Sequence, residues 1–289
     1  MRKTPLLFLL FHLFSICLFA QQKQAYQEAT EWDLAERKAK LSALKSAFLA
    51  NKEAMVTGVS EDYGHRSRHD TLYADILPTV SQFHYTLKRL AKWMKPSRRS
   101  PGLLLAPARI SVRYQPVGVV GIVVPWNFPI NLAIVPLITA IAAGNRVMLK
   151  MSEFTPKTNP VLADMISSVF SADEVALIEG ETQLSATFSQ LPFDHLLFTG
   201  STAVGKHVMR AAADNLTPVT LELGGKSPVI VAPDMDIKDA VSRTMFGKSL
   251  NAGQICVAPD YILCTRDKVS DFVIAYRKEF NRRYPNAMT

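Results

Sequence analysis

Residues 117–124 read VGVVGIVV, a nearly continuous run of β-branched side chains. A half-exposed strand alternates apolar and polar residues, whereas an unbroken apolar run is typical of a strand buried on both faces of its sheet. An apolar helical segment follows at residues 131–143 and ends at Gly144-Asn145, and residues 146–150 form a second short strand. Because parallel strands need such a crossover between them, this order predicts a parallel sheet.

The same alternation extends along the chain. Residues 21–95 have apolar side chains at three- and four-residue spacing, which predicts helices, and residues 109–114 alternate like a half-exposed strand. Further strands are predicted at residues 175–178, 195–199, 219–223 and 228–231, with helices at 160–170 and 203–213. The predicted fold class is α/β, a doubly wound, mostly parallel, Rossmann-like sheet with N-terminal helices.

The chain is long enough for about two domains. Residues 261–264 and the helix after Asp267 predict the start of a second α/β domain. We therefore expect a leader at residues 1–20, the sheet domain with its N-terminal helices at 21–224, and the beginning of a second domain at 225–289.

Composition excludes several protein classes. Of 289 residues, 48% are hydrophobic and 20% are charged, which rules out a disordered chain. The 3 cysteines are too few for a disulfide scaffold, and none has the C-x-x-C spacing of a thiolate zinc site. The net charge of +8 bears on solubility and partners, not on the fold.

The amino terminus resembles a leader. Arg2 and Lys3 precede an apolar run at residues 5–20, which matches a signal peptide but is short for a membrane span, so we expect no stable span. Leu18 stands where a cleavage site needs a small residue. Export therefore competes with a divergent leader on a protein that begins near Gln21.

Two patterns suggest ligands that the surrounding sequence does not support. His65 and His69 have the spacing of metal ligands on one helix face, but no third ligand is near, so we expect surface histidines and no metal site. Eight basic residues and no acidic one lie between Lys88 and Arg113, but no nucleic-acid module surrounds them. A solvated surface is the better interpretation, and we expect no nucleic-acid partner.

Residues 200–206 read GSTAVGK and match the P-loop pattern G-x-x-x-x-G-K. The next residue is His207, not the Ser or Thr that would bind Mg²⁺, so a nucleotide-hydrolysing site is excluded. A glycine turn at a helix N-terminus remains, which favours a phosphate or pyrophosphate through free backbone N–H groups. Gly200 and Gly205 alone are a weak signal, because the dinucleotide fingerprint G-x-G-x-x-G is absent.

Two residues are candidates for chemistry. Cys256 lies in a small, polar, turn-like stretch after a helix, where a thiolate could be accessible, whereas Cys264 has the apolar neighbours of a structural cysteine. Glu222 closes an apolar strand, and the carboxyl ends of strands are where open α/β sheets place their chemistry. A strand-end glutamate in solvent is the alternative.

Five motifs in register resemble the aldehyde dehydrogenase superfamily: PWNFP at residues 125–129, Lys150 with Ser152-Glu153, FTGS at 198–201, ELGGKSP at 222–228 and GQIC at 253–256. The resemblance covers the chain from about Gln21 to its end. Within the superfamily, GHRSRH at residues 64–69 and LTPVT at 216–220 resemble the coniferyl aldehyde dehydrogenase branch.

The resemblance implies catalytic roles that suit the residue types. Cys256 would attack the aldehyde carbon as a thiolate, forming a thiohemiacetal and then a thioester. The Asn127 side-chain amide and the Cys256 backbone N–H would stabilise the oxyanion, where one such donor is worth ~3 kcal/mol. Glu222 would act as general base on the water that hydrolyses the thioester.

The resemblance also implies a cofactor site in the domain at residues 21–224. Lys150 and Glu153 would bind the adenosine ribose, and a carboxylate there favours NAD over NADP because it repels a 2′-phosphate. Gly200 and Ser201 would bind the pyrophosphate. Trp126 would line the same groove unless it is a core aromatic. We assign the remaining cofactor contacts to Gly205 and Leu223.

The resemblance implies an NAD-dependent oxidoreductase that acts on a small-molecule aldehyde, favouring coniferyl or a related aromatic aldehyde. A general or fatty aldehyde dehydrogenase and an inactive NAD-binding fragment are the alternatives. Family members continue well beyond this chain's end, so we expect an incomplete catalytic domain with exposed apolar surface. Full-length members form homo-oligomers, and a site for NAD favours a cytoplasmic location over export.

Overall fold

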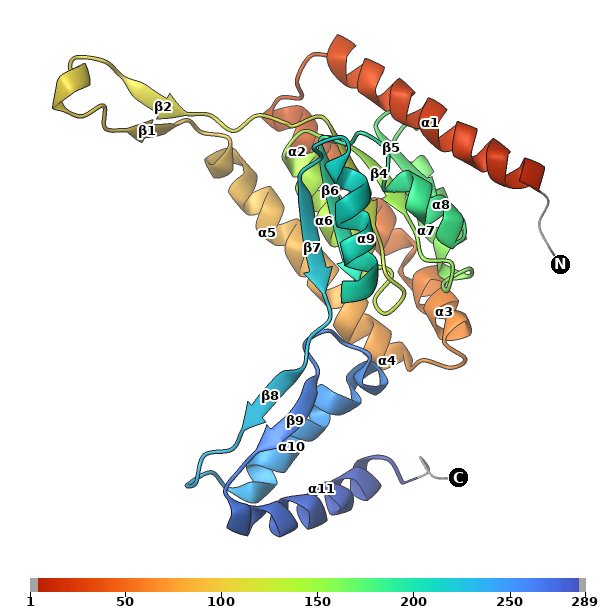
Figure 1. Cartoon of the computed structure of the whole chain (residues 1–289), viewed down its shortest axis with the longest axis vertical. Helices are drawn as coiled ribbons and strands as arrows, with labels where there is room; N and C mark the ends of the chain where they lie inside the picture. Colours follow the sequence, from red (N-terminus) through yellow and green to blue (C-terminus); the bar gives the residue numbers. More distant parts are fainter. Residues whose placement is uncertain (1–4, 286–289) are drawn as a thin grey trace. The chain divides into compact units, whose positions relative to one another are not determined.

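The computed structural model describes residues 5–285, with side chains described from residue 13 onward. The predicted basic n-region, Arg2 and Lys3, lies outside the described residues. The chain divides after Glu222 into two compact units (Figure 1), called unit 1 and unit 2 below and described separately.

Unit 1 is built on a five-stranded sheet with the order β5-β4-β3-β6-β7. The strands are β3 (Val119–Val123), β4 (Arg146–Lys150), β5 (Val175–Ile178), β6 (His195–Gly200) and β7 (Val219–Leu223), whose last residue is the first of unit 2. β3 pairs in parallel with β4 and β6, and β4 pairs in parallel with β5. The predicted α/β fold with a mostly parallel, Rossmann-like sheet is confirmed.

The strand order reverses beside β3. The chain runs outward from β3 through β4 to β5, then returns to the other side of β3 and forms β6. In open α/β sheets, ligands bind at the carboxyl ends of the strands at such a switch point. The loops that follow β3 and β6 therefore flank the expected ligand crevice of unit 1.

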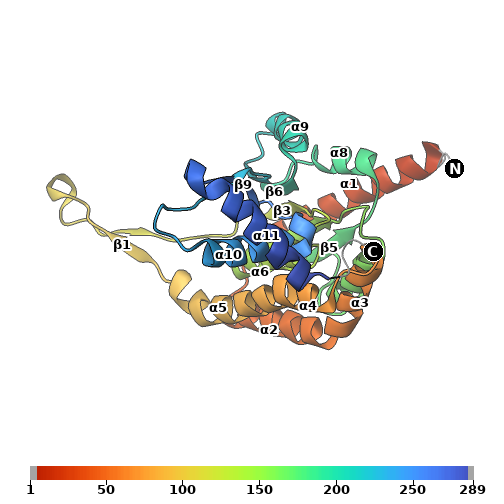
Figure 2. The same ribbon diagram turned by 90° about the horizontal axis from the view of Figure 1, so that it is seen from below.

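Helices cover both faces of this sheet. Figure 2 shows α1, α8 and α9 on one side and α2, α3 and α5 on the other, while α6 packs on β3 and β4, and α7 on β5. The helices and helical turns of unit 1 are α1 (Pro5–Glu28), α2 (Leu34–Ala50), α3 (Lys52–Asp62), α4 (Arg68–Thr71), the π-helical turn η1 (Leu72–Ile76), α5 (Leu77–Trp93), the 3-10 turn η2 (Leu103–Leu105), α6 (Asn131–Ala142), α7 (Thr158–Ser167), α8 (Thr182–Phe188) and α9 (Thr202–Ala213).

The main hydrophobic core lies between the sheet and the N-terminal helices. Leu41, Leu44 and Phe48 of α2 are completely buried, and so are Phe83 of α5 and Leu137 of α6. Their spacing of three and four residues on α2 is the pattern that predicted this helix. Burial of each such side chain contributes ~1.5–3 kcal/mol.

The predicted leader boundary at residue 20 falls inside α1. Leu18 and Phe19 are buried, and Phe19 makes an edge-to-face contact with Phe193 at a centroid distance of 5.3 Å. The fully buried Gln22 amide donates to the carbonyl of Val147 at 3.1 Å. The structure therefore extends the folded contacts of unit 1 back to Ser15. No helix among residues 5–285 is long and apolar enough to cross a membrane.

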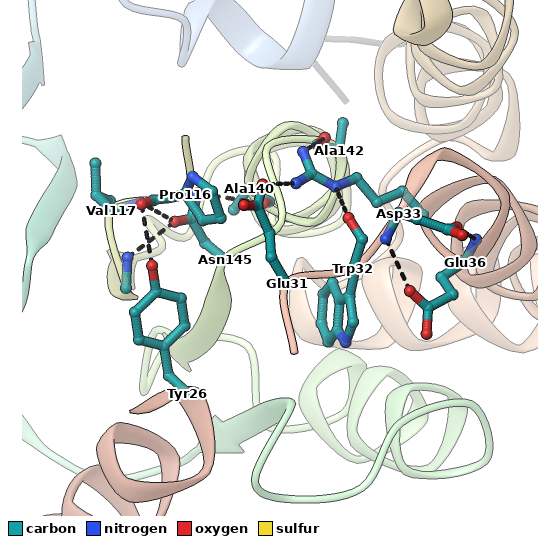
Figure 3. Close-up of polar contacts among 12 residues, drawn as sticks. Tyr26, Glu31, Trp32, Asp33, Glu36, Pro116, Val117, Ala140, Ala142 and Asn145 are labelled. Atoms are coloured by element: carbon teal, nitrogen blue, oxygen red, sulfur yellow. Dashed lines mark hydrogen bonds and ion pairs between the residues drawn. The ribbon is translucent and has the colours of Figure 1, made fainter. Parts of the chain in front are cut away.

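The connection from α1 to α2 is joined to the end of α6 and the start of β3 (Figure 3). The buried Arg37 guanidinium donates to the carbonyls of Trp32 at 2.9 Å and Ala142 at 3.0 Å. The Asn145 amide oxygen accepts from the backbone of Val117 at 2.7 Å. Gly144, predicted to end this helix, has φ +88°, and a Cβ there would lie 2.6 Å from Arg37. These contacts fix the entry to β3.

A two-stranded antiparallel hairpin, β1 (Ser97–Arg99) and β2 (Ile110–Val112), extends from the end of α5. All of β2 is exposed, unlike the half-exposed strand predicted at residues 109–114. Leu103 and Leu104 in η2 are 92% and 98% exposed. The basic segment between Lys88 and Arg113 thus spans the end of α5 and this hairpin.

Unit 2 contains β8 (Ser227–Ile230), α10 (Ile237–Ser249), the 3-10 turn η3 (Leu250–Gly253), β9 (Pro259–Leu263), the 3-10 turn η4 (Arg266–Lys268) and α11 (Val269–Arg283). β8 and β9 are parallel. Its core is small, with Val231, Ala240, Val241 and Phe272 buried. Unit 2 thus has the order strand–helix–strand–helix, while the domain boundary expected at residues 224–225 stays a prediction.

Candidate active site

The loop between β3 and α6 contains Asn127. Ahead of it, Val124 N–H donates to the Lys150 carbonyl at 2.9 Å and continues the sheet hydrogen bonding. Trp126 is exposed, which excludes the core-aromatic alternative, while Asn127 is half-buried and Phe128 is buried. The Asn127 backbone carbonyl accepts from Arg66 Nη1 at 3.1 Å. The strand end and Arg66 thus both fix this loop.

Lys150 and Glu153 lie at the carboxyl end of β4. The Lys150 side chain is buried, and its ammonium donates to the Met151 carbonyl at 2.5 Å. Burial lowers the pKa of Lys150, and the carboxylates of Glu153 and Glu179 oppose that shift. Glu153 is half-buried and accepts from the Thr182 hydroxyl at 3.3 Å. An ammonium and a carboxylate are therefore available together at this strand end.

Buried polar contacts fix the turn after β4. The Asn159 amide donates to the Ser152 carbonyl at 2.9 Å and accepts from the Thr155 hydroxyl at 2.8 Å. Asp62, at the end of α3, accepts from the N–H groups of Lys157 at 2.8 Å and Thr158 at 2.9 Å. The N-terminal helices thus position this loop as well as the Asn127 loop.

Gly200 and Ser201 lie at the junction of β6 and α9. The Ser201 side chain accepts from Val204 N–H at 3.3 Å and caps α9. A Cβ on Gly200 would lie 2.5 Å from the ring of Phe198, so only glycine fits this turn without a shift. Gly205 is buried within α9. The helix N-terminus predicted as an anion site is present at the carboxyl edge of the sheet.

Glu222 and Leu223 close β7, where Glu222 is exposed and Leu223 is half-buried. Glu222 is the last residue of unit 1, and Leu223 is the first of unit 2. The exposed carboxylate is accessible to solvent water, which agrees with a strand-end glutamate in solvent and is also compatible with a general base.

Cys256 belongs to unit 2 and lies in an exposed loop after η3. Asn251, Ala252 and Gly253 have φ values of 49°, 53° and 77°, so three successive residues adopt the left-handed conformation. A Cβ on Gly225 would lie 3.0 Å from the Cys256 carbonyl oxygen, so the Gly224-Gly225 turn lies directly against this loop. Left-handed Asn and Ala residues are uncommon, and such conformations cluster at active sites and ligand-binding loops.

The structure thus brings Trp126, Asn127, Lys150, Glu153, Gly200 and Ser201 to the carboxyl edge of the sheet of unit 1, and it describes Cys256 within unit 2. Sequence reasoning missed the residues that fix the Asn127 loop from outside, chiefly Tyr63, Arg66 and Asp75. The only sequence feature that drew attention to Arg66 was the resemblance of residues 64–69 to one branch of a family. No sequence feature drew attention to Asp75.

The structure offers no metal centre among its described residues, since no group of three His, Cys, Asp or Glu side chains there could bind a metal ion. His65 lies in the loop before α4 and His69 within it, so the two do not share a helix face. Both are exposed, as expected of surface histidines.

The aldehyde dehydrogenase family model matches residues 18–284. The chain belongs to the aldehyde dehydrogenase family. It is 52% identical over 268 residues to a probable coniferyl aldehyde dehydrogenase from Pseudomonas aeruginosa, covering 93% of this chain and 56% of that protein. It is 46% identical to a coniferyl aldehyde dehydrogenase from Pseudomonas sp. strain HR199, covering 93% and 55%. The resemblance to this branch of the family is therefore confirmed.

Solved aldehyde dehydrogenase structures agree with this assignment. The substrate-bound state of Staphylococcus aureus AldH matches with a TM-score of 0.90 and 36% identity, covering 94% of this chain and 59% of that one. A Mycobacterium tuberculosis aldehyde dehydrogenase complexed with NAD⁺ matches with a TM-score of 0.85 and 28% identity, covering 92% and 55%. The chain spans a little over half the length of the relatives it matches.

Proposed function

We propose that this chain is an NAD-dependent aldehyde dehydrogenase that oxidises coniferyl aldehyde, or a related aromatic aldehyde, to the carboxylic acid. The observation that carries the proposal is the position of the family motifs. The loops after β3, β4 and β6 lie together at the carboxyl edge of a sheet whose strand order reverses beside β3. Relatives named for coniferyl aldehyde favour an aromatic substrate.

The residues at this edge fit a dinucleotide. The buried Lys150 ammonium and the nearby Glu153 carboxylate suit the hydroxyl groups of a ribose. The capped N-terminus of α9 after Gly200 suits a pyrophosphate. Because Glu153 would repel a 2′-phosphate, NAD is the proposed cofactor and NADP is not. Trp126, Gly205 and Leu223 complete the proposed cofactor contacts.

In this mechanism the protein supplies a nucleophile, an oxyanion site and a base. When bound, the nicotinamide would supply the acceptor for the hydride that the aldehyde carbon loses. The Cys256 thiolate attacks the aldehyde carbon and becomes covalently attached to it as a thiohemiacetal. The Asn127 side-chain amide and the Cys256 N–H donate to the oxygen that gains negative charge. Loss of hydride from this carbon leaves a thioester, and Glu222 takes a proton from the water that hydrolyses it, which releases the acid and the thiol.

The test is NADH formation by the 289-residue chain with coniferyl aldehyde and with an aliphatic aldehyde. We expect faster turnover with coniferyl aldehyde. Cys256→Ala should abolish turnover and keep NAD binding, while the matched control Cys264→Ala should keep both. Turnover that survives Cys256→Ala would refute the mechanism. A folded chain that binds NAD but forms no NADH would reduce the proposal to a cofactor-binding fragment.

The proposal also covers the partner, the cellular location and the oligomeric state of the enzyme. A small-molecule aldehyde is its proposed partner, and the need for NAD places it in the cytoplasm. Assembly into a homo-oligomer, as in full-length members of the family, stays a prediction.

A further inference from the structure

A buried ion pair lies beside the Asn127 loop. Arg66 Nη2 and Asp75 Oδ2 are 3.1 Å apart, with side chains 3% and 0% exposed. Desolvation of two charges costs about as much as their attraction returns, so a buried pair is weak evidence of a stability function. The contacts that the pair makes with its surroundings point to a different role.

Arg66 contacts both residues that the Asn127–Phe128 peptide bond joins. Its Nη1 donates to the Asn127 carbonyl at 3.1 Å, and its guanidinium lies 5.0 Å from the ring centre of Phe128. The guanidinium is also 5.2 Å from the ring of Tyr63, whose hydroxyl donates to the Trp126 carbonyl. Three consecutive residues of the loop, 126–128, are thus fixed by two side chains from the end of α3.

Asp75 fixes the other end of the loop. Its Oδ1 accepts from Asn131 N–H at 3.0 Å, and the Ile130 N–H also donates to this carboxylate. The Asn131 amide donates to the Thr79 hydroxyl at 3.0 Å, and that hydroxyl donates to the Asp75 carbonyl at 2.7 Å. Asp75 lies in the π-helical turn η1, a geometry found frequently at functional sites.

The local backbone directs Arg66 inward. α3 ends in a Schellman motif, in which His65 N–H donates to the Ser60 carbonyl at 2.8 Å and Gly64 N–H to Glu61 at 3.3 Å. Gly64 has φ +59° and His65 has φ +88°, so a strained non-glycine residue immediately precedes Arg66. Two residues later, Arg68 instead forms an exposed ion pair with Glu53.

We propose that Arg66 and Asp75 are a positioning pair that sets the backbone of residues 126–131 and thereby places the Asn127 amide for oxyanion stabilisation. This inference rests on the proposed function. The pair touches neither substrate nor cofactor and acts through Asn127. Burial raises the pKa of Asp75 to about 6, and the Arg66 guanidinium opposes that rise, which favours the carboxylate that accepts from the loop N–H groups.

The first test does not depend on activity. The double variant Arg66→Met/Asp75→Asn removes both charges, so neither is left buried and unpaired. We expect amide hydrogen exchange at residues 127–131 to accelerate about ten-fold or more in this variant. Exchange in the fully buried strand β4 should be unchanged. Arg68→Met, the matched control from the start of α4, should change the exchange of neither segment. Unchanged exchange at residues 127–131 in the double variant would overturn the proposal.

The second test asks whether the pair acts through Asn127. In the double variant we expect kcat to fall about 10–100-fold, part of the loss typical of a missing oxyanion donor, with KM for NAD unchanged. In an Asn127→Ala background, the same two substitutions should lower kcat by less than about three-fold, because non-additivity reports coupling. Additive losses would overturn the proposal. The single variant Arg66→Lys keeps the charge but loses the fork of donors. Its kcat should therefore lie between that of wild type and that of the double variant.

The two tests separate this inference from the proposed function. If wild type forms no NADH, the proposed function fails for this chain, and hydrogen exchange alone decides whether the pair orders the loop. If wild type is active but Asn127→Ala has full kcat, the oxyanion role of Asn127 is wrong. A positioning role toward that amide is then wrong too, even if exchange shows that the pair orders the backbone.

Discussion

The Asn127 loop of unit 1 and the Cys256 loop of unit 2 are fixed in different ways. The Asn127 loop joins two buried elements and is contacted by Tyr63, Arg66 and Asp75 from the N-terminal helices. The Cys256 loop contains short-range hydrogen bonds, such as Gln254 N–H to the Asn251 carbonyl at 3.0 Å, and three successive left-handed residues. Long-range side-chain contacts thus fix the proposed oxyanion donor, whereas an unusual backbone conformation and the close approach of the Gly225 backbone shape the loop of the proposed nucleophile.

The hydrophobic cores of the two units also differ in size and in how completely their side chains are buried. The core of unit 1 includes large, completely buried side chains such as Phe48 and Phe83. The core cluster of unit 2 contains only four buried hydrophobic side chains, Val231, Ala240, Val241 and Phe272, and Ile230 on β8 is 77% exposed. Because apolar burial is the main source of stability, we expect unit 1 to be the more stable unit.

The largest effect is expected from Glu222→Gln. Without the general base, thioester hydrolysis should slow about 10²–10⁴-fold. Hydride transfer should still occur once, so rapid-mixing measurements should show a burst of one NADH per chain followed by a stall. The isosteric amide keeps the shape of the exposed strand end. Sustained turnover at the wild-type rate would reject Glu222 as the base.

Truncation of one core phenylalanine in each unit sharpens the comparison. Phe48→Ala should lower the free energy of unfolding of unit 1 by about 3–5 kcal/mol, because Phe48 is completely buried against Phe83. Phe272→Ala should cost unit 2 less than about 3 kcal/mol, because the cluster around Phe272 is small and consists largely of partly buried side chains that can relax.

Tryptophan fluorescence separates these two effects. The 3 tryptophans, Trp32, Trp93 and Trp126, all belong to unit 1. Urea unfolding followed by fluorescence should therefore shift to lower concentration in Phe48→Ala and stay in place in Phe272→Ala. A shift of the fluorescence transition in Phe272→Ala would mean that the stabilities of the two units are coupled.

A pH-dependent difference is expected between wild type and Asp75→Asn. Burial raises the Asp75 pKa from 3.8 to about 6 in the folded chain, so the folded state binds this proton more tightly than the unfolded state does. As pH falls from 7 toward 4, the free energy of unfolding of wild type should rise relative to that of the variant, and the gain should be complete below pH 3.8. Fluorescence-monitored unfolding across this window measures it. A constant difference would show that the pKa of Asp75 is not raised.

The smallest effect is expected at the exposed apolar positions of unit 2. Ile230→Thr should change the free energy of unfolding by no more than about 0.5 kcal/mol, because the side chain is mostly in solvent. Far-UV circular dichroism during urea unfolding follows both units and measures the change. A large loss of stability would show that Ile230 is buried in solution.

Local sequence patterns predicted most of the sheet. The strands expected at residues 146–150, 175–178 and 219–223 match β4, β5 and β7 residue for residue, and the helix expected at 131–143 matches α6 to within one residue. Apolar runs and the Gly144-Asn145 stop are local signals, so they need no knowledge of the tertiary structure.

Local patterns could not identify the residues that fix the loops of the candidate site. Asp75 lies 56 residues from Asn131, which it fixes, and its neighbours in η1 have an ordinary helical composition. The leader expected at residues 1–20 stays a prediction for a similar reason, because an apolar run has the same pattern whether it belongs to a leader or packs, like Phe19, against a ring as distant as Phe193. Long-range partners decide both cases.

Amide hydrogen exchange of the unmodified chain tests the contrast between the two loops most directly. We predict slow exchange at Ile130 and Asn131, whose N–H groups donate to buried Asp75, and fast exchange across residues 251–257. Equal protection in the two loops, or faster exchange at Ile130 and Asn131, would contradict the claim that this chain organises its oxyanion loop through long-range contacts.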